Sequence, residues 1–197
     1  MSFIEMASER GAEGPVVELF AADREEFGYV HNFTRLLAHR RGVDAAWSRL
    51  TAAIRGNMDL RRYELVTLAA ARRLRSSYCS LAHGTILRER FYDADTLVRI
   101  VADHHRAGLD PVDVAVMDFA DQVVVDAGSV TAGDVAVLRS HGLSDAEILD
   151  VALTAAARCF FSKVLSALDV EPDEAFREQL EPELHQALAG VRAAAPG

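Results

Sequence analysis

The stretch from Glu64 to Gly84, ELVTLAAARRLRSSYCSLAHG, places a pair of serines between two segments with a helical pattern. Small and apolar residues recur at spacings of three and four on both sides of the serines, which is the period of an α-helix. Serine is a preferred residue at a helix N-cap, so Ser76 or Ser77 marks the start of the second helix. The stretch therefore predicts two antiparallel helices joined by a short turn.

The helical period extends over almost the whole chain, and no sustained alternation of apolar and polar residues indicates a β-strand. We therefore expect an all-α, compact multi-helix bundle with the helical hairpin at its centre. Ser144 before Glu147 and Thr131 before Asp134 have the spacing of capping boxes. Helices are predicted at 15–26, 30–39, 43–54, 61–74, 77–90, 93–104, 112–126, 132–139, 145–167 and 173–180.

Length and composition indicate one folded domain. A chain of 197 residues can bury one sizeable core, and it holds 12 glycines and 5 prolines, which is few enough for a helical protein. We expect a single domain over residues 14–190, a flexible N-terminus over residues 1–13 and a flexible tail over residues 191–197.

Charge and residue usage exclude several classes of partner. A net charge of −9 would repel a phosphate backbone, so no nucleic-acid partner is expected. No apolar run is long enough for a membrane span, and the N-terminus lacks the pattern of a secretory leader. Two cysteines give no disulfide framework, which favours a cytoplasmic location. The chain has no glycine-rich phosphate loop or dinucleotide fingerprint, so no cofactor is predicted.

Four residues of the hairpin form a candidate site. Cys79 falls in the first turn of the second helix, where unpaired backbone N–H groups and the helix dipole favour a thiolate. His83 follows one turn later on the same face, where an imidazole relays a proton or pairs with the thiolate. Glu64, on the preceding helix, faces both if the hairpin is antiparallel, and it is then a candidate base. Tyr78 adds a phenol that donates to an anion or simply packs.

Glu64, fourteen intervening residues, Cys79, three residues and His83 resemble the core motif of the carboxymuconolactone decarboxylase and alkylhydroperoxidase D superfamily. The resemblance covers most of the chain, including a Gly-x-x-x-Asn segment that begins at Gly28. It implies the peroxidase-related branch, an antioxidant oxidoreductase with peroxiredoxin activity, and assembly as a homo-oligomer. In this branch Cys79 matches the cysteine that attacks peroxide, and Glu64 and His83 match the proton relay.

One position departs from the pattern of the peroxidases, which carry Cys-x-x-Cys-x-x-x-His. Ser76 stands where their resolving cysteine stands, so Cys79 is expected to work alone on a small-molecule hydroperoxide. Turnover then needs an external thiol or a thioredoxin-like reductant. Cys159 lies in the apolar segment AAARCFFSKVL and is expected to be a buried, inert thiol.

Two other interpretations stay open. The decarboxylase branch works by proton transfer on a small organic acid or lactone, which Glu64 and His83 serve without a thiol. A non-catalytic paralogue, in which Cys79 is only a small core residue, is the third.

No metal site is predicted. The segment DHHRAG, which begins at Asp103, contains a carboxylate followed directly by His104 and His105. Because neighbouring side chains on a helix point about 100° apart, these three side chains cannot all bind one metal ion. Asp118 and Asp121 are interpreted as a polar helix stripe.

Overall fold

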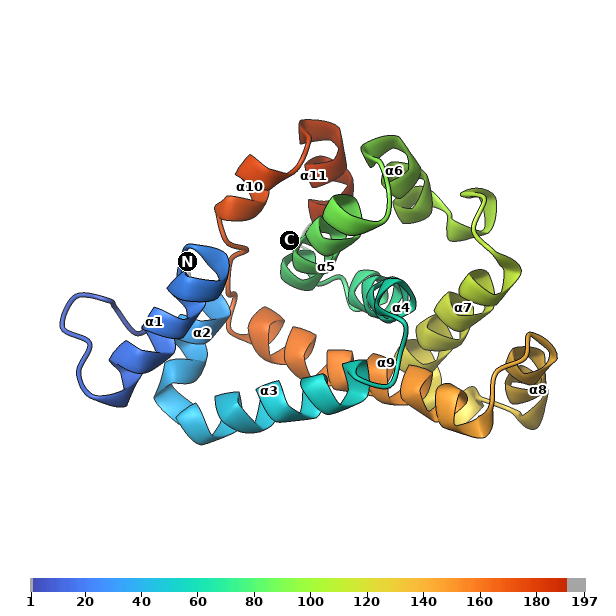
Figure 1. Ribbon diagram of the computed structural model, residues 1–197, viewed down its shortest axis with the longest axis horizontal. Helices are drawn as coiled ribbons and strands as arrows, with labels where there is room; N and C mark the ends of the chain where they lie inside the picture. Colours follow the sequence, from blue (N-terminus) through green and yellow to red (C-terminus); the bar gives the residue numbers. More distant parts are fainter. Residues whose placement is uncertain (1, 191–197) are drawn as a thin grey trace.

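A computed structural model describes residues 2–190 and contains only helices and connecting segments in this range (Figure 1). The central helix is α4 (Leu60–Arg73), and α5 (Ser77–Arg90), α7 (Pro111–Asp126) and α9 (Asp145–Ala167) pack on it. Nine consecutive residues of α4, from Tyr63 to Ala71, are buried. A helix that is buried on all sides belongs to the interior of a bundle, which confirms the all-α fold class.

The helical hairpin of α4 and α5 is confirmed, and caps define both helix starts. The side chain of Asp59 accepts a hydrogen bond from the backbone of Arg62, and Ser76 Oγ accepts one from the Cys79 N–H at 3.4 Å. Ser76 is therefore the N-cap that begins α5. Arg75 takes a left-handed conformation with φ of 55° in the turn between the helices.

The first third of the chain forms one flank of the bundle (Figure 1). It contains α1 (Pro15–Phe27), α2 (Asn32–Leu37), a 3₁₀ turn η1 (Ala38–Arg40) and α3 (Arg41–Arg55), which packs along α9. In the segment before α1, the Phe3 N–H donates to Leu168 O at 2.9 Å and the Ala7 N–H donates to Arg35 O at 3.0 Å. These bonds attach the segment to the end of α9 and to α2, while its flexibility stays a prediction.

The opposite flank consists of shorter helices between α5 and α9. It contains α6 (Ala94–Ala102), η2 (His104–Arg106), η3 (Ala127–Ser129) and α8 (Ala132–Ser140). The capping boxes predicted from Thr131 and Ser144 are both present, at the starts of α8 and α9.

The C-terminal part differs from the prediction of one helix at 173–180. The structure has a short α10 (Ala175–Gln179) and a further helix, α11 (Pro182–Ala189), which the sequence pattern did not indicate. Proline at the first helical position suits a helix start, and Leu184 and Leu188 are fully buried against α5 and α6. The predicted tail at 191–197 lies outside the described residues. None of the helices within residues 2–190 combines the length and apolarity that a membrane crossing needs.

Candidate functional site

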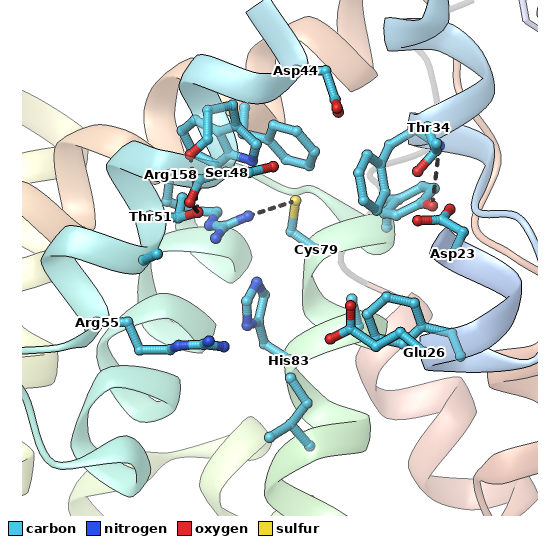
Figure 2. Close-up of a pocket in the computed structure, with 18 of the residues that line it drawn as sticks. Asp23, Glu26, Thr34, Asp44, Ser48, Thr51, Arg55, Cys79, His83 and Arg158 are labelled. Atoms are coloured by element: carbon cyan, nitrogen blue, oxygen red, sulfur yellow. Dashed lines mark hydrogen bonds between the residues drawn. The ribbon is translucent and has the colours of Figure 1, made fainter. Parts of the chain in front are cut away.

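A cavity of about 450 Å³ opens beside the hairpin, between α1, α3, α5 and α9 (Figure 2). Six aromatic side chains, from Phe27, Phe33, Trp47, Tyr63, Tyr78 and Phe161, contribute to its wall. Charged and reactive groups also line it: Asp23, Glu26, Asp44, Arg55, Glu64, Cys79, His83 and Arg158. The structure thus brings Glu64, Cys79 and His83 to one cavity, as the hairpin prediction requires.

Cys79 lies in the first turn of α5 and is 1% exposed. Because its backbone N–H is capped by Ser76, the residue is held at the start of the helix, where the dipole favours an anion. Its sulfur accepts a hydrogen bond from Nη1 of Arg158 at 3.6 Å (Figure 2). A guanidinium is always positively charged in proteins, so this contact places a permanent positive charge beside the sulfur.

Arg158 is the functional residue that the sequence interpretation missed. It comes from α9 and is 5% exposed, with its guanidinium carbon 5.8 Å from the Trp47 ring centre and 5.6 Å from that of Phe161. Within residues 2–190 no carboxylate forms a salt bridge with it, and its buried Nε has no hydrogen-bond partner. The available signal was a lone arginine within the apolar run of α9, directly before Cys159.

His83 and Glu64 form a close pair across the hairpin, with 2.6 Å between Nδ1 and Oε2. The Glu64 side chain is 1% exposed and that of His83 is 14% exposed. Burial lowers the pKa of His83, the charge of Arg158 lowers it further, and Glu64 acts in the opposite direction. A neutral imidazole that donates Nδ1–H to Glu64 keeps Nε2 as a free base.

The Tyr78 hydroxyl forms its hydrogen bonds with groups other than the Cys79 sulfur. It donates to Oδ2 of Asp173 at 2.5 Å and accepts a hydrogen bond from the Phe33 N–H at 3.3 Å. Burial, followed by the charge of Asp173, raises the pKa of Tyr78 well above its usual value. Tyr78 lines the cavity, and these contacts tie α5 to α2 and to the segment after α9.

Cys159 does not share the cavity. It is next to Arg158 on α9, so its side chain leaves the helix in another direction, and it is partly exposed rather than fully buried. Burial raises the pKa of its thiol, which makes it a poor nucleophile at neutral pH.

Two charged side chains on α3 extend the site. Arg55 reaches toward His83 (Figure 2), and Asp44 lines the same cavity near the start of the helix. Burial and then the charge of Asp23 raise the pKa of Asp44. The cavity therefore holds two guanidinium groups, from Arg55 and Arg158, together with carboxyl groups from α1, α3 and α4.

No protein-family model matches the chain, and no curated protein matches it in sequence. Solved structures do match its fold. One is a peroxidase-related protein from Ralstonia eutropha JMP134, described as an alkylhydroperoxidase AhpD core, with a TM-score of 0.80 and 22% identity over 89% of this chain and 94% of that chain. A peroxidase-related protein from Silicibacter sp. TM1040 gives 0.78 and 22% over 87% and 93%.

A variant of the debrominase Bmp8, in complex with 2,3,4-tribromopyrrole, also matches, with a TM-score of 0.75 and 12% identity over 93% of this chain and 100% of that chain. Because the sequence identities are only 12% to 22%, these comparisons establish a similarity of fold and nothing further. The chain has the alkylhydroperoxidase AhpD-like fold, which confirms the fold that the motif at Glu64, Cys79 and His83 implied.

Proposed function

We propose that the protein is a thiol-dependent, peroxidase-like enzyme of the alkylhydroperoxidase D-like superfamily, with Cys79 as its single reactive thiol. The observation that carries the proposal is the buried guanidinium of Arg158 on the Cys79 sulfur. A buried charge without a carboxylate partner is costly, and a thiolate compensates for it directly. A cysteine that served only as a small apolar core residue would gain no stability from a buried guanidinium group at its sulfur.

In the proposed reaction the thiolate attacks the terminal oxygen of an organic hydroperoxide. An S–O bond forms, the O–O bond breaks, and the sulfur is oxidised to a sulfenic acid while the hydroperoxide is reduced to an alcohol. Nε2 of His83 takes the proton of the Cys79 thiol and returns it to the leaving alkoxide, while Glu64 holds the imidazole in place. The cavity of about 450 Å³ has the size of an organic ligand site, which favours an organic hydroperoxide over hydrogen peroxide.

The second half of the cycle needs two external thiols. The first condenses with the sulfenic acid and releases water, and the second reduces the mixed disulfide and restores Cys79. Because Cys79 is 1% exposed, a small thiol that enters the cavity suits the site better than the surface cysteine of a thioredoxin-like protein. Both cysteines of the chain are free, which is consistent with a reducing cytoplasm.

Proton transfer on a small organic acid is the second candidate function. The observation that favours it is the pair of guanidinium groups from Arg55 and Arg158 beside the base His83, since guanidinium groups bind carboxylates. This chemistry does not need the thiol.

The test is intact mass spectrometry after graded treatment with an organic hydroperoxide, with dimedone to trap sulfenic acid. We expect one dimedone adduct on the wild type and on Cys159→Ser, no adduct on Cys79→Ser, and hydroperoxide turnover with small thiols. If Cys79→Ser keeps full activity on an organic acid while the wild type forms no adduct, the proton-transfer function replaces the peroxidase. Binding of 2,3,4-tribromopyrrole to Cys79→Ser would add a halogenated aromatic to the ligands of the cavity.

A further inference from the structure

A second cluster of reactive side chains lies outside the cavity, where η2 meets α7. His104 and His105 are consecutive residues of η2, and Asp118 comes from α7. One atom from each, an imidazole nitrogen or a carboxylate oxygen, lies within 4.8 Å of the others. The cluster does not depend on the function proposed for Cys79.

The two imidazoles face the same carboxylate. Nε2 of His104 lies 2.8 Å from Oδ1 of Asp118, and Nε2 of His105 lies 2.9 Å from the same oxygen. The two rings are stacked with centres 4.2 Å apart. The expectation that these neighbouring histidines diverge on a helix is therefore wrong, because α6 ends at Ala102 and both histidines lie on the 3₁₀ turn η2, from which both rings reach Asp118.

Asp103 orients one of the imidazoles. Its Oδ1 lies 3.2 Å from Nδ1 of His105, on the ring edge opposite Asp118. When Nδ1 carries the proton and donates it to Asp103, the lone pair of Nε2 faces Asp118. Metal-binding histidines are oriented in this way, by a carboxylate on the second ring nitrogen.

The donor set fits a first-row divalent ion. Two imidazole nitrogens and one carboxylate oxygen are the ligands of zinc sites that keep a fourth position for water, with bonds of about 2.0 to 2.2 Å. Tetrahedral ligands at such bond lengths are about 3.4 Å apart, so the distances of 2.8 and 2.9 Å from Asp118 Oδ1 to the two imidazole nitrogens need to lengthen by about 0.5 Å. The half-exposed side chains of His105 and Asp118 leave access for the ion and its water.

We propose that His104, His105 and Asp118 bind a divalent transition-metal ion, Zn²⁺ by preference, with a water molecule as the fourth ligand. Such an ion joins η2 to α7, the helix that packs on the central helix α4. Binding only to the folded chain raises the stability of the fold by mass action.

The test uses untagged protein in which Cys79→Ser and Cys159→Ser remove the thiols as competing ligands. Calorimetric titration with Zn²⁺ is expected to give one equivalent bound. The thermal midpoint is expected to rise by about 5 °C or more at a Zn²⁺ concentration about a hundredfold above Kd. Co²⁺ in place of Zn²⁺ gives visible absorption bands of a site with nitrogen and oxygen ligands.

Asp118→Asn keeps the size of the side chain and is expected to weaken Zn²⁺ binding at least tenfold, as is the exposed His105→Ala. His39→Ala, an exposed histidine on another element, is the matched control and leaves binding unchanged. The proposal is overturned if the parent binds no Zn²⁺, or if Asp118→Asn and His105→Ala both bind it as tightly as the parent.

Discussion

Arg158 carries a buried positive charge that lies against two aromatic rings and points at the Cys79 sulfur. Glu64 brings a buried negative charge to the same cavity, and His83 experiences both. The protonation state of His83 therefore reports on the electrostatics that the proposed mechanism uses. Burial and the charge of Arg158 lower the pKa of His83, which favours the neutral imidazole.

Two substitutions are predicted to shift the pKa of His83 in opposite directions. In Arg158→Gln the pKa rises, because a neighbouring positive charge no longer opposes protonation. In Glu64→Gln it falls further, because the carboxylate that favours the imidazolium is gone. Titration of the His83 ring protons by NMR measures both, with the wild type expected below 6.5. Shifts of the same sign in the two variants would show that the assignment of charges in the cavity is incorrect.

The sequence indicated the local part of the site and missed the distant part. Cys79 and His83 are one helical turn apart and Glu64 lies on the adjoining helix, so spacing, together with the resemblance to the superfamily motif, predicted that they meet. Arg158 approaches from a helix 79 residues further along the chain, and no local pattern encodes that contact. The hydroxyl of Tyr78 was predicted beside the thiol of Cys79, but it donates its hydrogen bond to the buried carboxylate of Asp173.

At the scale of elements, α4 and α5 followed from helical period and capping, while α11 did not. The apolar pattern of α11 is too short to predict a helix, and its contacts with α5 and α6 explain why it forms. Leu188 of α11 packs where Gly84 of α5 lacks a side chain, and a Cβ built on Gly84 would lie 2.4 Å from Leu188 Cδ1. Leu188 is fully buried and cannot turn aside easily.

Gly84→Ala is therefore predicted to destabilise the protein by about 1 to 3 kcal/mol, because an added methyl group overpacks this contact. Chemical denaturation measures the change in unfolding free energy. Gly42→Ala is the control, since it lies in α3 with nothing within 4 Å of its Cβ position, and it is expected to be neutral or mildly stabilising. Equal stability of Gly84→Ala and the wild type would mean that α11 does not pack on α5 as described.

At the scale of the whole molecule, α9 both carries Arg158 and presents an apolar surface. Leu149 is 57% exposed, Leu153 is 39% exposed and Phe160 is 50% exposed, on a helix whose other faces are buried. Leu149 and Leu153 are one turn apart and form a continuous strip. The composition of α9 predicted more apolar surface than one face needs, and the assembly that covers it stays a prediction.

We predict that the protein is a homo-oligomer at low micromolar concentration, with this strip of α9 in the interface. Analytical ultracentrifugation is expected to give a mass above that of one chain, and Leu149→Glu is expected to shift it toward the monomer because a buried, unpaired charge is costly. Ala136→Glu, which adds the same charge at an exposed position of α8, serves as a control for a general effect of charge. A wild-type monomer whose mass does not change with concentration would contradict the prediction.

The most direct test of the account is the rate at which an organic hydroperoxide oxidises Cys79, measured by stopped flow at neutral pH in a Cys159→Ser background. Cys79 is expected to react at a rate well above that of free cysteine. The rate is expected to decrease at least tenfold in Arg158→Gln, equivalent to about 1.4 kcal/mol of activation free energy, with partial recovery in Arg158→Lys. A Cys79 that reacts no faster than free cysteine, with the same rate in Arg158→Gln, would contradict the account.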